Sequence, residues 1–71
     1  MFNKLALSHA MLDANCSARD LAKACNISPS AFYRRINGDV PFNIGEIDSC
    51  VSRLRLTPEG RDKIFFASEV T

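Results

Sequence analysis

The sequence predicts an all-α protein, a compact bundle of five short helices in a single domain, residues 1–71. Three observations indicate this fold. Apolar residues recur at helical spacing, helix-start signals such as Ser17 and Asn43 punctuate the chain, and no credible strand pattern occurs. A chain of 71 residues has room for one small domain with a modest core.

The first helix is expected over residues 3–14. Its apolar face combines Leu7, Met11 and Ala14, and Leu5 and Leu12 broaden that face. Asn15 suits the exit from this helix, because asparagine tolerates a left-handed backbone.

The second helix has a stronger start signal. Ser17 can cap it while Asp20 reaches back in a variant capping box, and Cys16 and Leu21 are placed for a hydrophobic staple. The inner face is a narrow stripe of mostly small residues: Ala18, Leu21, Ala22 and Cys25. Such a stripe lets another helix approach closely.

A tight turn separates the second helix from the third. Asn26 stands where a left-handed residue is needed, and asparagine is the best choice there after glycine. Ser28 then caps the third helix, and Pro29 occupies its first position, where the missing N–H costs nothing. The helix runs to about Asn37.

The third helix has two different faces. Phe32 and Ile36 share the inner face on a helical wheel, and the outward residues are Ser30, Tyr33, Arg34 and Asn37. No acidic residue lies between Ser28 and Gly38. The outward face is therefore polar and basic.

Two further helices complete the chain. Asn43 and Glu46 form a capping-box pair, Phe42 and Ile47 a staple, and the apolar stripe that follows consists of Ile44, Ile47, Val51 and Leu54. The last helix is expected over about 57–68, beginning at Thr57 and Pro58. It carries the apolar run Ile64, Phe65 and Phe66.

Charge and composition exclude several classes of protein. The net charge is only +1, but residues 1–38 hold five bases against two acids, whereas residues 39–71 hold four against six. No apolar run approaches the roughly 20 residues that span a bilayer, and the first residues lack a signal-peptide layout. We therefore expect a cytoplasmic protein whose first half can turn toward phosphate.

Catalysis and metal binding find no support in the sequence. The single histidine, His9, has no acid or nucleophile near it in sequence, and no phosphate-loop or metal motif occurs. The three cysteines, Cys16, Cys25 and Cys50, are interpreted as small, mostly buried free thiols. We expect no enzyme activity, no cofactor and no metal.

A capped helix of small residues, a tight turn and a second capped helix with a basic outer face predict a helix-turn-helix over about 17–37. The major groove of DNA admits one α-helix, whose outward side chains reach base edges. The segment from Ala18 to Gly38 resembles the helix-turn-helix of small phage repressor and Cro-like regulators, with Ala22 at the small buried position. Asn26 departs from the glycine that is frequent in that family.

The resemblance implies a lambda-repressor-like fold and a DNA-binding transcriptional regulator, with these residues in contact. The residues that match groove-facing positions are Ser28, Pro29, Ser30, Tyr33, Arg34 and Asn37, and those expected at phosphates are Ser17, Arg19, Arg35 and Asn43. For Arg35, an internal ion pair is the alternative.

Two further questions stay open at this point. A helical protein-interaction module on the same fold, such as an anti-repressor or adaptor, is the alternative function. The resemblance also implies a possible homodimer on a palindromic DNA operator. Its contact residues would be Ile64, Phe65, Phe66 and Val70. The alternative role for that C-terminal segment is to close the core only.

Overall fold

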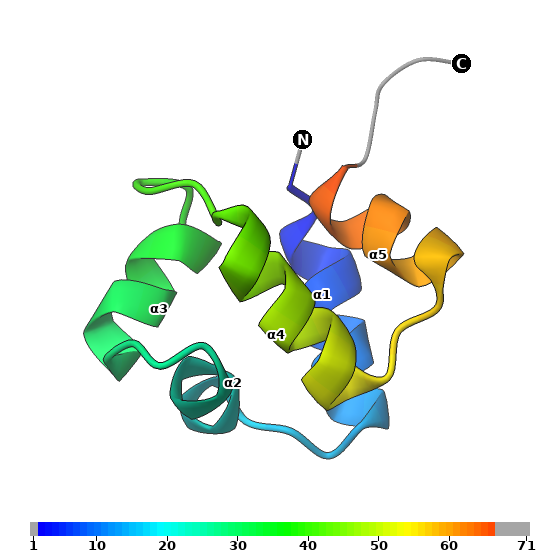
Figure 1. Ribbon diagram of the computed structural model, residues 1–71, viewed down its shortest axis with the longest axis horizontal. Helices are drawn as coiled ribbons and strands as arrows, with labels where there is room; N and C mark the ends of the chain where they lie inside the picture. The colour runs from blue at the N-terminus through cyan, green and yellow to red at the C-terminus, as the bar shows by residue number, and fades with distance from the viewer. Residues whose placement is uncertain (1, 67–71) are drawn as a thin grey trace.

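The structure, a computed structural model, describes residues 2–66, which form five α-helices and no strand. In chain order these are α1 (Lys4–Asp13), α2 (Ala18–Ala24), α3 (Pro29–Ile36), α4 (Ile44–Leu54) and α5 (Pro58–Phe65). The predicted all-α class is confirmed. In Figure 1, α4 runs through the middle, with α2 and α3 to its left and α1 and α5 to its right. None of the described helices is both long and apolar enough to cross a membrane.

Every described helix begins at a side chain that caps it. In each case the side-chain oxygen accepts a hydrogen bond of 2.7–3.1 Å from the backbone N–H three residues later. The caps are Asn3, Ser17, Ser28, Asn43 and Thr57. The predicted starts at the last four are confirmed, and reciprocal capping boxes are present on α2 and α4.

The chain leaves four of these helices through a left-handed residue. Asn15 has φ 53° and Asn26 has φ 61°, as expected of asparagine at those positions. Arg55 ends α4 at φ 56°, which the sequence did not indicate because arginine has no side-chain means of favouring that conformation. Gly38, at φ 89°, follows α3.

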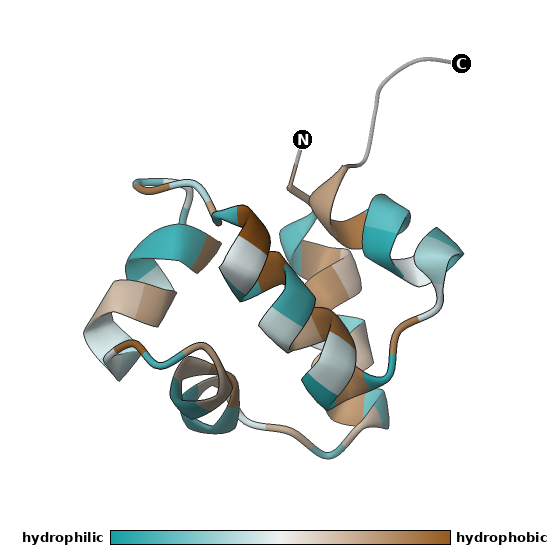
Figure 2. Ribbon diagram, viewed as in Figure 1, coloured by the Kyte–Doolittle hydropathy of each residue, from teal (hydrophilic) through white to brown (hydrophobic). Residues whose placement is uncertain are grey.

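The core lies where α4 meets the other helices. Its largest fully buried side chains are Leu7, Leu21, Phe32 and Cys50. Figure 2 shows apolar residues concentrated along one edge of α4. Of the predicted α4 stripe, Ile47 and Leu54 are buried and Val51 is partly buried against the core.

Four phenylalanines form an aromatic cluster that joins distant parts of the chain: Phe2, Phe32, Phe42 and Phe65. The Phe42 ring lies 5.2 Å from both the Phe2 and Phe65 rings and 5.9 Å from the Phe32 ring, measured between centroids. Beside this cluster, the backbone N–H of Asn3 donates a 2.7 Å hydrogen bond to the carbonyl of Ile64. The start of α1 and the end of α5 are thereby held side by side.

Three predicted core residues are wrong. Leu5 and Leu12 are 66% and 78% exposed, because they lie about 150° around the helix from Leu7, which packs into the core. Ile44 is 65% exposed, since it is the first residue of α4 and no neighbouring helix covers it. The last helix ends at Phe65, and residues 67 and 68 of its expected range lie outside the described part of the chain.

Candidate nucleic-acid interface

The unit formed by α2, its following turn and α3 is built from local hydrogen bonds. The left-handed Asn26 turns the chain, and its N–H donates to the carbonyl of Lys23 at 3.0 Å. The next N–H, of Ile27, donates to the carbonyl of Ala22 at 3.0 Å. Ala22 is itself buried, so the turn sits directly on the inner face of α2. This corner fixes how α3 leaves α2, and α2 packs against both α3 and α4.

The two faces of α3 separate as the sequence predicts. Phe32 is 0% exposed and Ile36 packs partly buried against the core, whereas Tyr33 is 53% exposed. We call the exposed side of this helix the α3 face. Its members are Ser28, Pro29, Ser30, Tyr33, Arg34 and Asn37, all exposed.

The charge of the α3 face is positive. Arg34 lies on it and makes no ion pair with any described residue, and no acid occurs within α3. The acids nearest in sequence are Asp20 at the start of α2 and Asp39 in the loop after α3. Asp20 is occupied by its capping box, where it accepts the Ser17 N–H at 3.1 Å.

Three of the four expected phosphate contacts are exposed. Ser17 and Asn43 each accept a capping hydrogen bond through the side-chain oxygen, which leaves the amino group of the Asn43 side chain to donate. Arg19 lines a shallow hollow of about 350 Å³ beside the turn, together with Lys23 and the first residues of the α3 face. Lys23 was not among the expected phosphate contacts, and only its position in this hollow, next to Arg19, indicates it as a candidate.

Arg35 takes the other role that was open to it. Its Nε donates to Glu46 Oε1 at 2.8 Å, and its Nη1 donates to the carbonyl of Ala31 at 2.9 Å. The two charged side chains are only 17% and 8% exposed. The expectation that Arg35 contacts phosphate is therefore wrong, because its guanidinium is turned inward to an internal ion pair.

A residue that the sequence did not indicate also reaches the α3 face. Lys4, in the first turn of α1, donates from Nζ to Asn37 Oδ1 at 3.3 Å. The two residues are 33 positions apart, and no local pattern in the sequence signals their contact. An additional positive charge therefore stands at the C-terminal end of α3.

The expected dimer residues divide into two groups. Ile64 and Phe65 are 2% and 7% exposed and belong to the core of this chain, so they cannot form a contact surface in this conformation. Phe66 is 47% exposed and stays available. Val70 lies outside the described residues.

His9 and the three cysteines lie outside the α3 face. His9 is exposed on α1, and no group of three or more potential metal ligands is found among these residues. Cys16 and Cys50 are buried and Cys25 is half-buried, all as free thiols. Burial raises the pKa of the Cys50 thiol far above its ordinary value, which suppresses the reactive thiolate.

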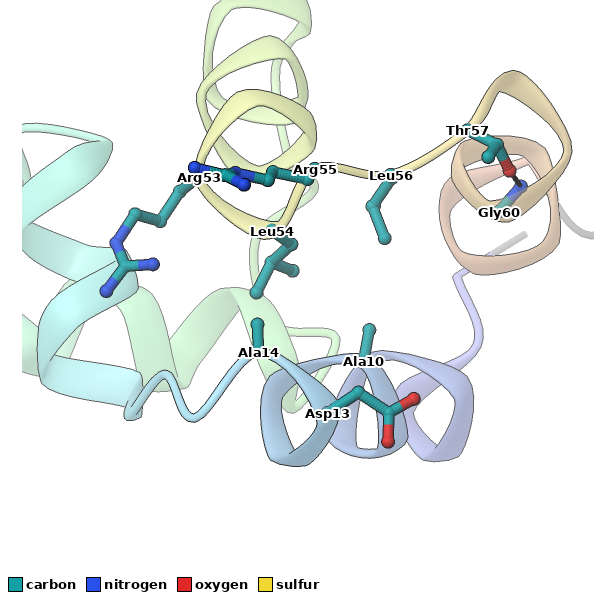
Figure 3. A pocket seen from close by; sticks show the side chains of 9 residues that line it. All are labelled: Ala10, Asp13, Ala14, Arg53, Leu54, Arg55, Leu56, Thr57 and Gly60. Atoms are coloured by element: carbon teal, nitrogen blue, oxygen red, sulfur yellow. Dashed lines mark hydrogen bonds between the residues drawn. The ribbon is translucent and has the colours of Figure 1, made fainter.

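A second hollow, of about 590 Å³, lies between α1 and the link from α4 to α5 (Figure 3). Small side chains of α1, Ala10 and Ala14, line one wall, and Leu54 and Leu56 face them. In Figure 3 Arg53 points away toward α2, and the Thr57 hydroxyl is hydrogen-bonded to the Gly60 N–H. Asp13 and Arg55 complete the polar part of its lining.

No protein-family model matches the chain, and searches of curated proteins and of solved structures found no match either.

Proposed function

We propose that the protein is a sequence-specific transcriptional regulator that binds double-stranded DNA through a helix-turn-helix of the lambda-repressor-like type. The observation that carries this proposal is the separation of the two faces of α3. Phe32 anchors the helix in the core at 0% exposure, while the α3 face is exposed, polar and free of acids.

The proposal assigns a distinct role to each part of the α3 face. The major groove is about 12 Å wide and admits one helix, whose outward side chains can reach base edges. Arg34, at the centre of the face, would donate to guanine or to a phosphate, and Ser30 and Asn37 would hydrogen-bond to base edges. Tyr33 would donate to a phosphate or stack on a sugar.

Residues outside α3 would hold the protein in register on the phosphate backbone. Arg19 lies with Lys23 beside the N-terminal end of α3, Ser17 is exposed at the start of α2, and Asn43 has a side-chain amino donor at the start of α4. Such contacts carry no sequence information but fix orientation. Binding should therefore weaken steeply with added salt, because each neutralised phosphate releases counterions.

We also propose that two copies bind together on an inverted repeat. A single domain of this size makes few DNA contacts, and pairing doubles them. Among the residues expected at the dimer contact, Phe66 is exposed within the part of the chain that the structure describes. With Ile44 it borders an apolar groove of about 600 Å³ next to the loop that follows α3.

Selection of bound sequences from a random duplex DNA pool tests the proposal. Enrichment of an inverted repeat, with half-sites about one helical turn apart, would support a dimeric regulator. A single enriched half-site would support the regulator and contradict the dimer. No enrichment, with binding lost at physiological salt, would contradict DNA recognition and favour the protein-interaction alternative.

Replacing the central arginine tests the α3 face directly. Arg34→Ala should weaken binding to the selected site by about 1–3 kcal/mol, or roughly fivefold to 150-fold, with folding unchanged. Fluorescence anisotropy measures the affinity, and Lys63→Ala on α5 removes the same charge from an exposed site away from α3. Equal affinities for the two variants would remove Arg34 from the interface.

A further inference from the structure

Lys4 reaches the α3 face although it does not belong to the helix-turn-helix. It belongs to α1, yet its ammonium lies 3.3 Å from Asn37 Oδ1 at the C-terminal end of α3. Both residues are exposed, and Lys4 has no carboxylate within ion-pair distance among residues 2–66. The positive charge of Lys4 is therefore not neutralised by the described part of the chain.

We propose that Lys4 is a phosphate-binding residue that also positions Asn37 for DNA recognition, an inference that rests on the proposed function. A lysine ammonium carries three N–H donors. One of them is used on Asn37, and the other two remain for the oxygens of one phosphate. Lysine acts at such a group as a compact point charge.

The hydrogen bond also decides what Asn37 presents to DNA. Because its Oδ1 accepts from Lys4, the Nδ2 amino group is the part of the carboxamide left for a partner. An amino group donates only, so its partner must be an acceptor. The acceptors on DNA within reach of such a donor are a phosphate oxygen, guanine O6 or N7, adenine N7 and thymine O4.

The placement of Lys4 complements that of the basic residues at the other end of α3. Arg19 and Lys23 lie beside the first residues of the α3 face, and Lys4 lies beside the last one. Positive side chains therefore stand beside both ends of α3, where phosphates that flank a helix in the groove could be contacted.

A role in folding alone does not account for this arrangement. An exposed hydrogen bond between two long or mobile side chains adds little to stability, because water competes for both partners. A DNA phosphate would supply the negative charge that Lys4 lacks within the described chain.

The test compares Lys4→Gln with Lys63→Gln, which removes the same charge from α5. Affinity for the selected duplex is measured by anisotropy over a range of salt concentrations, with far-UV circular dichroism to verify folding. Lys4→Gln should lower the slope of log affinity against log salt by about 0.9, the value for one phosphate contact. Lys4→Arg should restore the slope, and Lys63→Gln should leave it unchanged.

Positioning of Asn37 has a separate readout. In a double-mutant cycle, the losses of affinity from Lys4→Gln and Asn37→Ala should be non-additive, since Asn37 acts in the orientation that Lys4 imposes. A wild-type slope in Lys4→Gln would overturn the phosphate contact, and additive losses would overturn the positioning. Failure of the wild-type chain to bind any duplex would instead overturn the proposed function itself.

Discussion

Glu46 links α3 to α4 through one carboxylate oxygen. Its Oε1 accepts from Arg35 Nε at 2.8 Å and from the backbone N–H of Asn43 at 3.1 Å. The Glu46 side chain is only 8% exposed. If one partner of the ion pair were removed, water could not fully solvate the charge that remained. The pair therefore holds the C-terminal end of α3 to the start of α4.

Glu46→Gln tests this link at the scale of one residue. The amide keeps an acceptor oxygen but leaves the Arg35 guanidinium inward-facing and without a counter-charge. The free energy of unfolding in urea should fall by about 3 kcal/mol, the lower end of the range for broken buried pairs. Asp48→Asn, which removes a charge from an exposed position on α4, is the control. A loss below about 1 kcal/mol for Glu46→Gln would show that the pair contributes little.

At the scale of the element, the capping box of α2 makes stability depend on pH. The backbone N–H of Ser17 donates to Asp20 Oδ2 at 3.1 Å, and this bond, followed by that with the Ser17 side chain, lowers the pKa of Asp20 below its ordinary 3.8. A carboxyl whose pKa is lower in the folded chain stabilises it above the unfolded pKa. That contribution is lost as the pH falls through the lowered value.

Asp20→Asn should remove this dependence. As the pH falls below about 4, the free energy of unfolding of the wild-type chain should decline more steeply than that of the variant, whose amide cannot ionise. Urea titrations at a series of acidic pH values give both curves. Parallel curves would mean that the cap does not favour the charged form of Asp20.

The elements themselves were largely predictable, because their boundaries depend on local chemistry. Ser17, Ser28 and Asn43 cap the next few residues of their own chain segment, and Asn26 adopts its left-handed turn within a short stretch. The buried faces of the helices were less predictable than their boundaries. Periodicity groups apolar residues, but another helix decides which are covered, and none covers Leu5 or Ile44.

Contacts between distant elements could not be predicted from the sequence. The α3 face was identified correctly as exposed, since Phe32 sets the phase of the helix. The inward turn of Arg35 and the reach of Lys4 to Asn37 depend on where α4 and α1 pack against α3. No pattern within a single helix contains that information.

At the scale of the whole molecule, the aromatic cluster is what unites the two halves of the bundle. Phe42, from the loop before α4, contacts the rings of Phe2, Phe32 and Phe65 at centroid distances of 5.2–5.9 Å. The N-terminal segment, α3 and α5 thus share one apolar centre. Phe32 carries the α3 face on the opposite side of its helix, so the stability of the core and the presentation of the face are coupled.

Phe32→Ala should therefore cost about 3–5 kcal/mol of unfolding free energy, as for other fully buried aromatic truncations. Phe66→Ala, at a 47% exposed position, is the matched control and should cost far less. Phe32→Leu serves if the alanine variant is too unstable to purify. Urea denaturation monitored by circular dichroism measures all three, and similar losses at positions 32 and 66 would contradict the assigned core.

The hydrogen bond from Asn3 to the carbonyl of Ile64 has a consequence for the chain as it is made. A nascent polypeptide leaves the ribosome with its N-terminus first, so α1 emerges long before α5, the helix that covers it. The bundle cannot close until α5 has cleared the exit tunnel. A message truncated within α5 would leave the core unclosed, and α3 would lose part of the apolar centre that holds its exposed face in place.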